Sequence, residues 1–220
     1  MRACAPCPPP SPPLPMTLLL IRHGETALNV ARVLQPADTP LSAAGRAQAA
    51  ALATRLAGAG LAGLVSSDLP RARETAEAVS RACGLPVHWS PLLQERNFGD
   101  WRGRAYDTLG ADPLHGDASP PGGETAAQFE QRVAAAFALL RVHQAGCGGP
   151  LAVVTHGLVI KALLQRHARL APGLGWPAHG LRNTSLSRIA AEPPHDCDLL
   201  DCTRHLDEAA APAPRGLSGG

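Results

Sequence analysis

Two histidines of this chain stand where side chains can do chemistry, because each lies just beyond a short apolar run and directly before a glycine. His23 comes after the run 18–21, and His156 comes after the run 151–154. Short, wholly apolar runs are typical of strands buried on both faces of a parallel sheet. Ligands of such sheets bind at the carboxyl ends of the strands, beside helix N-termini that favour anions. One histidine at such a place is more often structural, but the matched pair predicts a site.

Two arginines accompany these histidines at the same kind of junction. Arg22 precedes His23, and Arg71 lies in the segment 66–75, between a predicted strand and a predicted helix. The planar fork of arginine suits a phosphoryl group better than the point charge of lysine does. The alternative is an exposed helix start with ordinary surface charges. Two histidines and two arginines at strand ends favour a phosphate pocket.

Strands and helices must alternate along the chain to position these residues. The apolar pattern and the capping residues predict strands at 17–21, 61–66, 87–89, 151–155 and 184–190, and helices at 43–57, 69–83, 125–144 and 157–170. A Gly- and Pro-rich stretch at 99–123 is long enough to form a lid or cap. Alternation of this kind predicts an α/β fold with a mostly parallel sheet.

The two ends of the 220-residue chain carry no periodic apolar pattern. Residues 1–15 include seven prolines, and we expect them to form an extended, disordered segment. Met16 directly precedes the first predicted strand, and our hypothesis is that translation begins there. Residues 207–220 are rich in Ala, Pro, Gly and Ser, and we expect a disordered tail there. The folded domain is therefore predicted to span residues 16–206.

Composition argues against several classes of protein. With 45% hydrophobic residues the chain can bury a core, which argues against global disorder. Its formal charge is only +2 and its aromatic content only 3%, unlike the clustered basic and aromatic surface of a nucleic-acid binder. No apolar run approaches the length of a membrane span, and the six cysteines do not suggest a disulfide scaffold. We expect a soluble, cytoplasmic protein.

A set of short motifs, in a fixed order along residues 17–206, extends the argument. The motifs are Arg22–Thr26, Thr39–Ser42 with Gly45, Ser67–Thr75, Gln94–Glu95 with Phe98–Trp101, Pro121–Thr125, Thr155–Gly157, Asn183–Ser185 and His205–Leu206. One Arg-His-Gly triplet is a weak signal, but the ordered set resembles the histidine phosphatase superfamily, also called phosphoglycerate-mutase-like. The resemblance implies a three-layer α/β/α fold with a mostly parallel central sheet and a small cap insertion.

The resemblance also implies a role for each matching residue. His23 would be the nucleophile that forms a phosphohistidine intermediate, for which its attacking nitrogen must be neutral. Arg22, Arg71 and His156 would bind the phosphoryl oxygens and stabilise charge in the transition state. Glu95 would protonate the leaving oxygen and then accept a proton from the attacking water. Neither a metal nor a cofactor is implied, because positioning and fixed positive charge carry this kind of transfer.

Some assignments stay open within this resemblance. Asp100 lies five residues after Glu95 in the same Gly-rich loop and could be the general acid instead, although residues 92–95 fit the pattern of the family better. Burial would have to raise the pKa of Glu95 for it to act near neutral pH. Asn29 and Thr26 are expected either to line the loop or to bind phosphate.

The superfamily contains both phosphatases and mutases, and the segment that follows Glu95 indicates which of the two this chain resembles more. Mutases resemble one another in a longer insertion with paired arginines, whereas residues 100–121 are short and contain no Arg-Arg pair. The stretch 98–103 looks more like the phosphatase branch, so we expect a phosphomonoesterase that acts on a small phosphate ester, as a monomer or homodimer. The alternatives are a phosphoglycerate mutase, an α-ribazole phosphatase of cobalamin synthesis and a catalytically silent phosphate-binding protein. Polar side chains near the cap are candidates for contact with the leaving group, although a solvated loop position is their more common role: Arg96, Arg102, Arg104, Tyr106 and His115.

Three other patterns carry less weight. Residues 58–63 match the glycine spacing of a dinucleotide site, but they follow a helix and precede a strand, which is the reverse of the required order. Cys4 and Cys7 have redox-like spacing but lie in the Pro-rich segment. The His, Asp and Cys residues at 195–205 lack a familiar metal-ligand spacing. We therefore expect neither a dinucleotide site nor a metal site.

Overall fold

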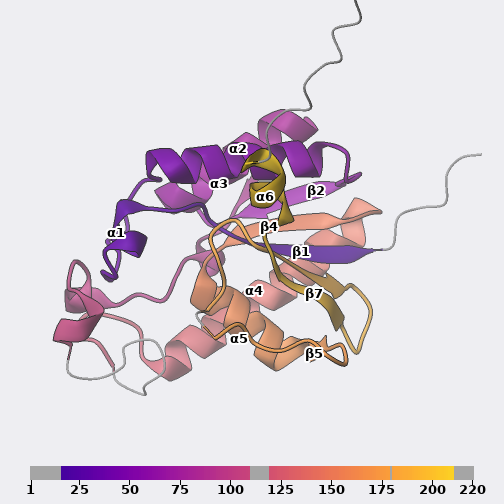
Figure 1. Cartoon of the computed structure of the whole chain (residues 1–220). Helices are drawn as coiled ribbons and strands as arrows, with labels where there is room; N and C mark the ends of the chain where they lie inside the picture. The colour runs from indigo at the N-terminus through magenta and orange to yellow at the C-terminus, as the bar shows by residue number, and fades with distance from the viewer. Residues whose placement is uncertain (1–15, 110–118, 179, 211–220) are drawn as a thin grey trace, which may run out of the picture.

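A computed structural model describes residues 16–109, 119–178 and 180–210 (Figure 1). The predicted N-terminal segment 1–15, residues 211–220 of the predicted tail, His115 and His179 lie outside the described residues. Within the described ranges, no helix is long and apolar enough to cross a membrane.

A seven-stranded sheet with the strand order β3-β2-β4-β1-β6-β7-β5 forms the centre of the molecule. The strands are β1 (Thr17–Arg22), β2 (Gly63–Ser66), β3 (His88–Trp89), β4 (Leu151–Thr155), β5 (Arg169–Leu170), β6 (Leu186–Ala190) and β7 (Asp196–Cys202). The pairs β1–β4, β2–β4, β2–β3 and β5–β7 are parallel, whereas β6 is antiparallel to both β1 and β7. The predicted mostly parallel sheet is therefore confirmed.

Helices cover both faces of this sheet, as Figure 1 shows. On one face lie α2 (Ala43–Ala57), α3 (Pro70–Cys83) and α6 (Arg204–Ala210), and on the other lie α4 (Ala126–Cys147) and α5 (Gly157–His167). The connecting segments hold α1 (Ala27–Val30) and the 3₁₀ turns η1 (Pro91–Leu93), η2 (Gly99–Trp101) and η3 (Tyr106–Thr108). This is the predicted three-layer α/β/α architecture, and η2 and η3 occupy the predicted cap segment.

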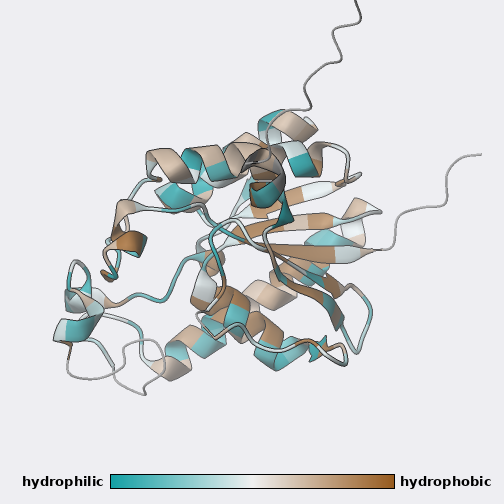
Figure 2. Ribbon diagram, in the orientation of Figure 1, coloured by the Kyte–Doolittle hydropathy of each residue, from teal (hydrophilic) through white to brown (hydrophobic). Residues whose placement is uncertain are grey.

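The central strands are buried because they are apolar on both faces. Leu18 and Leu20 of β1 join the core cluster under α4 and α5, whereas Leu19 and Ile21 join the cluster under α2 and α3. This alternation follows from the two-residue period of a strand. Figure 2 shows the hydrophobic colour along β1. Burial of each such side chain contributes about 1.5–3 kcal/mol, so the carboxyl end of the strand is held firmly in place.

Local capping signals set the ends of the helices. The Ser42 hydroxyl accepts a hydrogen bond from the Gly45 N–H at 2.9 Å at the start of α2. Thr125 and Gln128 form a capping box at the start of α4. Gly84, with a φ of 69°, ends α3 in the left-handed conformation that favours glycine. Because these signals are local, the predicted bounds of α2 are correct and those of α3 differ by one residue.

The helix predicted at 157–170 is wrong in its last three residues. α5 ends at His167, and Arg169 and Leu170 instead form β5. The Arg169 N–H donates to the His195 carbonyl at 3.3 Å, which attaches this short strand to the start of β7. Pairing with a distant segment therefore replaces the last turn of the predicted helix.

The strand predicted at 184–190 is not the last strand, because β7 follows it. The β7 sequence contains three aspartates and has low intrinsic strand propensity. Ion pairs across neighbouring strands offset this: Arg188 to Asp198 and Arg169 to Asp196, each at 2.8 Å. After β7, α6 runs to Ala210, four residues beyond the predicted end of the folded domain at 206.

The other weak sequence patterns have structural roles. Gly58 is the C-cap of α2 and Gly63 opens β2, so residues 58–63 are a helix end and a turn. In the segment 195–205, the Asp201 carboxylate accepts from Arg182 at 2.8 Å, and other aspartates pair across the sheet. Among the described residues, no group of three or more His, Cys, Asp or Glu side chains could hold a metal ion.

Candidate active site

The two predicted histidines meet at the carboxyl edge of the sheet. In the parallel pair β1–β4, Arg22 lies opposite Thr155, so the next residues, His23 and His156, are neighbours. Their ring centroids are 5.1 Å apart and their planes are tilted by 59°. Both side chains are buried, with exposed fractions of 2% and 0%.

The backbone fixes the tautomer of His23. Its Nδ1 lies 2.7 Å from the Gly24 carbonyl oxygen. Since a carbonyl can only accept, Nδ1 carries the proton, and Nε2 of the neutral ring carries a lone pair. Burial lowers the pKa of His23 well below its ordinary value, Arg71 and Arg22 lower it further, and the Gly24 carbonyl opposes them. His23 is therefore neutral near pH 7, as a nucleophile must be.

Close backbone packing holds the loop that follows β1. A Cβ on Gly24 would lie 2.6 Å from the carbonyl oxygen of Gly45, and a Cβ on Gly45 would lie 2.0 Å from that of Glu25. Glycine is required at both places because a side chain would collide with backbone. The Gly24 N–H also donates to Thr75 Oγ1 on α3 at 3.0 Å. The loop and α3, which carries Arg71, are thus fixed relative to each other.

His156 caps the N-terminus of α5 with its backbone, while its ring faces the site. Its Nε2 lies 2.9 Å from Ser67 Oγ, and its buried Nδ1 has no partner among the described residues. Burial lowers the pKa of His156 well below its ordinary value, and Arg71 and His23 add to the effect. A buried ring nitrogen without a partner is uncommon and leaves hydrogen-bonding capacity for a ligand.

Arg22 and Arg71 bring positive charge that the protein only partly satisfies. Arg22 Nη1 donates to the Leu181 carbonyl, and Arg71 Nη1 donates to the Pro36 carbonyl at 3.3 Å. The Nε atoms of both arginines are buried, and neither has a hydrogen-bond partner in the part of the chain that the structure describes. Burial is the largest cause that lowers the pKa of both groups, to about 10 for Arg71. Buried, incompletely paired cations of this kind favour an anionic ligand.

Glu95 lies beside these arginines in the loop after η1. Its carboxylate accepts from the Arg96 N–H at 2.9 Å and from the Leu158 N–H of α5 at 3.2 Å. Burial raises the pKa of Glu95, while these two N–H groups and the charges of Arg71 and Arg22 oppose the increase. A carboxyl group with a raised pKa next to positive charge can donate a proton and take one back.

Asp100, the other candidate acid, lies in a different environment. It is exposed in η2, and its backbone N–H donates to the Pro121 carbonyl at 2.9 Å. The charge of Glu95 raises the pKa of both Arg22 and Arg71, whereas Asp100 is not among the causes that shift either pKa. The electrostatics therefore favour Glu95 as the carboxyl group of the site.

Thr26 and Asn29 use their polar groups within the loop itself. They form a capping box at the start of α1, in which Thr26 Oγ1 accepts from the Asn29 N–H at 3.0 Å. Thr26 Oγ1 also donates to Gln35 Oε1 at 2.9 Å, and Asn29 Oδ1 accepts from Asn183 Nδ2 at 3.2 Å. These contacts match the loop-lining alternative, and contact with phosphate stays a prediction.

The residues proposed for the leaving group lie in unlike places. Arg96 is 6% exposed and donates to the Glu124 carbonyl at 3.2 Å, so it supports the loop. Arg104 is exposed and donates to the Thr108 carbonyl at 3.3 Å. Arg102 and Tyr106 are half-buried, and both carry electrostatic effects that reach Arg71. Of the described candidates for contact with the leaving group, Arg102 and Tyr106 are therefore the two that shift the pKa of Arg71.

Two contributors had no role in the sequence analysis. Ser67 orients His156, and its position directly after β2, at the same sheet edge, could have revealed it. Arg132 lies inside α4 and bonds the loop around Glu95, with an Nη1 donating to the Gln94 carbonyl at 2.7 Å. Nothing in the local sequence marks this contact, because the carbonyls of the loop lie 37 to 40 residues away from Arg132 along the chain.

Known proteins are similar to this chain over most of its length. The family model described as histidine phosphatase superfamily (branch 1) matches residues 18–198. A Yersinia enterocolitica protein named "Probable phosphoglycerate mutase GpmB" is 34% identical over 189 residues, which cover 79% of this chain and 84% of that protein.

Two solved structures of phosphatases are similar as well. The α-ribazole phosphatase from Shigella flexneri has a TM-score of 0.71 and 30% identity, and the match covers 85% of this chain and 96% of that one. The mycobacterial glucosyl-3-phosphoglycerate phosphatase in complex with VO3 has a TM-score of 0.68 and 33% identity, with 79% and 90% covered. The matched region 18–198 includes both histidines, both arginines and the Glu95 loop. The chain belongs to the histidine phosphatase superfamily.

Proposed function

We propose that this chain is a metal-independent phosphomonoesterase, which acts on small phosphorylated metabolites through a phosphohistidine intermediate on His23. One observation carries the proposal. A neutral imidazole with a free Nε2 lone pair lies near two arginines whose buried Nε groups lack partners among the described residues. A dianionic phosphoryl group supplies the missing acceptors and an electrophilic phosphorus in the same place.

In the first half-reaction, the Nε2 lone pair of His23 attacks phosphorus, and the ester P–O bond breaks. The bonding electrons leave on the substrate oxygen, which takes the proton of the Glu95 carboxyl group. The raised pKa of Glu95, which burial causes, supports this role. Arg22, Arg71 and His156 stabilise the negative charge on the transferring oxygens. The products are an alcohol and phosphohistidine.

In the second half-reaction, water attacks the phosphorus of the intermediate. The Glu95 carboxylate accepts a proton from this water, and the N–P bond breaks with its electrons returning to Nε2 of His23. Inorganic phosphate leaves, and the neutral imidazole and protonated carboxyl group are restored. Ester and water thus become alcohol and phosphate.

A phosphoglycerate mutase is the second candidate function, because the name of the Yersinia enterocolitica relative favours it. A mutase returns the phosphoryl group from histidine to a substrate hydroxyl group instead of passing it to water. The names of the two similar solved structures favour a phosphatase and suggest α-ribazole phosphate and glucosyl-3-phosphoglycerate as substrates to test.

The test is phosphate release from a panel of esters, with and without EDTA. The panel holds 3-phosphoglycerate, glucosyl-3-phosphoglycerate, α-ribazole phosphate, sugar phosphates, nucleotides and 4-nitrophenyl phosphate. We expect release that EDTA does not affect, that His23→Ala abolishes and that His88→Ala, at an exposed histidine of β3, preserves. A quench with alkaline denaturant during turnover should trap a phosphoprotein that is stable in base and that releases its phosphate in acid.

Other outcomes would assign the chain differently. No phosphate release from any ester by folded wild-type protein would refute the phosphatase proposal. Interconversion of phosphoglycerates with a 2,3-bisphosphoglycerate primer would then identify a mutase. Phosphate binding without either reaction would identify a silent binding protein.

A further inference from the structure

Arg132 of α4 lies near the site and makes hydrogen bonds with all three of its guanidinium nitrogens. Its Nε and Nη2 donate to the two carboxylate oxygens of Glu124 at 2.6 and 2.7 Å. Its Nη1 donates to the carbonyls of Leu92 and Gln94 at 2.9 and 2.7 Å, and Nη2 reaches the Glu95 carbonyl at 3.4 Å. A guanidinium has five N–H donors, and here each has an acceptor.

These bonds restrain the backbone on both sides of Glu95. Before it, the carbonyls of Leu92 and Gln94 bind Arg132. After it, the Asn97 N–H donates to Glu124 Oε2 at 2.8 Å, and the Glu124 N–H donates back to the Asn97 carbonyl at 2.8 Å. One ion pair therefore connects both flanks of the loop whose carboxyl group faces the phosphate pocket.

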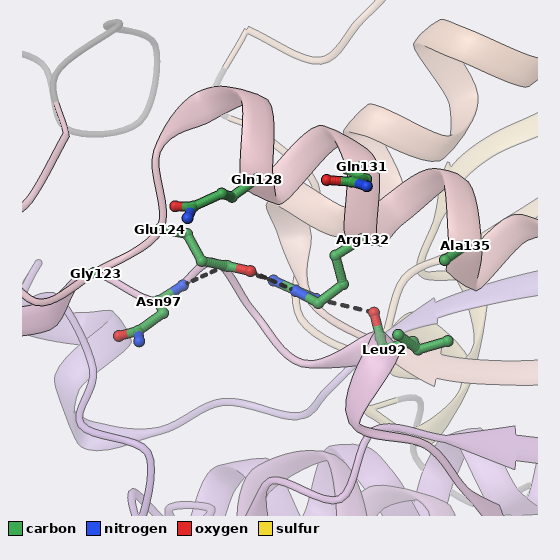
Figure 3. Close-up of a pocket in the computed structure, with 8 residues that line it drawn as sticks. All are labelled: Leu92, Asn97, Gly123, Glu124, Gln128, Gln131, Arg132 and Ala135. Atoms are coloured by element: carbon green, nitrogen blue, oxygen red, sulfur yellow. Dashed lines mark hydrogen bonds and ion pairs between the residues drawn. The ribbon is translucent and has the colours of Figure 1, made fainter.

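The surroundings of Arg132 separate it from the arginines of the phosphate pocket. Within the described ranges, the buried Nε atoms of Arg22 and Arg71 have no partners, whereas Arg132 has no donor left for a ligand. Figure 3 shows Arg132 pointing from α4 to Glu124 and to the Leu92 carbonyl. These groups border an open pocket of about 450 Å³, whose lining includes Leu92, Asn97, Glu124 and Arg132.

We propose that Arg132 and Glu124 form a clamp that positions the Glu95 carboxyl group for proton transfer to the leaving oxygen. Arg132 is thus a positioning residue, and the inference rests on the proposed phosphatase function. Proton donation needs the acid within hydrogen-bonding distance of the leaving oxygen, so a small displacement of the loop weakens it. The simpler alternative is an ion pair that only stabilises the fold.

Leaving-group dependence distinguishes these two roles. Arg132→Lys keeps the positive charge but loses the planar fork that holds both carboxylate oxygens. The matched control is Arg188→Lys, which removes the same bidentate geometry from the exposed pair with Asp198. For each protein, kcat/KM is measured with 4-nitrophenyl phosphate, whose leaving group needs little protonation, and with the best alkyl phosphate of the panel, whose leaving group needs it.

We expect Arg132→Lys to lower kcat/KM by about ten- to a hundredfold for the alkyl ester and by less than about threefold for the nitrophenyl ester. Arg188→Lys should change neither. An equal loss for both esters, or no loss, would overturn the clamp. If Arg132→Lys does not fold, Glu124→Gln, which keeps Arg132, is measured in the same way.

A second measurement does not depend on turnover. Carbon NMR titration of the Glu95 carboxyl group should show a different pKa in Arg132→Lys than in wild type, because the distances to Arg71 and Arg22 change. An unchanged titration would overturn the clamp as well. Absence of wild-type hydrolysis would instead refute the proposed function, so the two failures are distinguishable.

Discussion

The buried charge of Arg71 should lower the free energy of unfolding, and this gives a prediction with a definite sign. The side chain is 2% exposed and its Nε has no partner. Burial lowers the pKa of Arg71 from 12.5 to about 10. The charge of Glu95 opposes this shift but is smaller. At about 1.36 kcal/mol per pKa unit, charged Arg71 is about 3 kcal/mol less favourable in the folded state than in the unfolded state. Below the folded pKa this penalty is present in full, so it applies near pH 7.

Arg71→Met removes the charge and keeps an apolar chain in the space of the arginine stem. We expect the free energy of unfolding to rise by about 1–3 kcal/mol and Tm to rise by about 2–4 °C for each kcal/mol. If Arg71 binds the phosphoryl group as proposed, kcat/KM of the same variant should fall at least about a hundredfold. Stability and activity therefore change in opposite directions, as at other strained functional sites.

The assay is urea unfolding with and without orthovanadate. Wild-type protein should gain about 2.7 kcal/mol at a vanadate concentration a hundred times Kd, and Arg71→Met should gain far less. Arg73→Met is the control, because Arg73 lies on the same helix with its side chain 46% exposed, and it should change stability by less than about 0.5 kcal/mol. A loss of stability in Arg71→Met greater than that in Arg73→Met would refute the reasoning.

Three further predictions concern the loop, the general acid and pH. Gly45→Ala should destabilise the protein by more than about 2 kcal/mol in urea unfolding, because its Cβ would lie 2.0 Å from a backbone oxygen. Gly58→Ala is the control, because the space around Gly58 is open, and it should be neutral or stabilising. Equal effects of the two substitutions would contradict the packing argument. Glu95→Gln should lower kcat for the best alkyl phosphate about 10²–10⁴-fold and Asp100→Asn less than about threefold, and the reverse order would assign the acid to Asp100. Urea midpoints should fall as pH decreases below about 6.5, because the two buried imidazoles of the site stay neutral in the folded state while the unfolded chain binds protons; a fall of equal size in His23→Asn would contradict this account.

Elements with local signals were predictable from the sequence. The apolar runs of β1 and β4 and the caps of α2 and α3 act within a few residues, so these elements match the prediction closely. β7 and β5 were not predicted as strands, because their stability comes from pairing with each other and with β6 across the sheet. No window of local sequence contains that information.

The same distinction applies to the site. His23, Arg22 and His156 were predictable because a strand end fixes each position, and two adjacent parallel strands bring them together. The role of Arg132 was not, since the carbonyl it binds at Leu92 lies forty residues earlier in the chain. The Pro36 carbonyl, which accepts a hydrogen bond from Arg71, is also distant in sequence, at a separation of 35 residues.

The hydrogen bonds in the structure distinguish the arginines of this chain by function, although arginine accounts for nearly all of its positively charged side chains. The sequence predicts a phosphate-binding role for Arg71 from its place between a strand and a helix, and it predicts no role for Arg132. In the structure every donor of Arg132 has an acceptor, whereas the buried Nε donor of Arg71 has none among the described residues. A saturated guanidinium strengthens the fold and has nothing to offer a ligand. A guanidinium with an unpaired buried donor lowers the stability of the free protein. The same donor binds an anion when one is present, so the stability lost in the free protein and the stability gained in the complex have one cause. We therefore expect the free energy of unfolding to rise in Arg71→Met and to fall in Arg132→Lys. Changes of opposite sign would distinguish an arginine that is available to a ligand from one whose donors are all used within the protein.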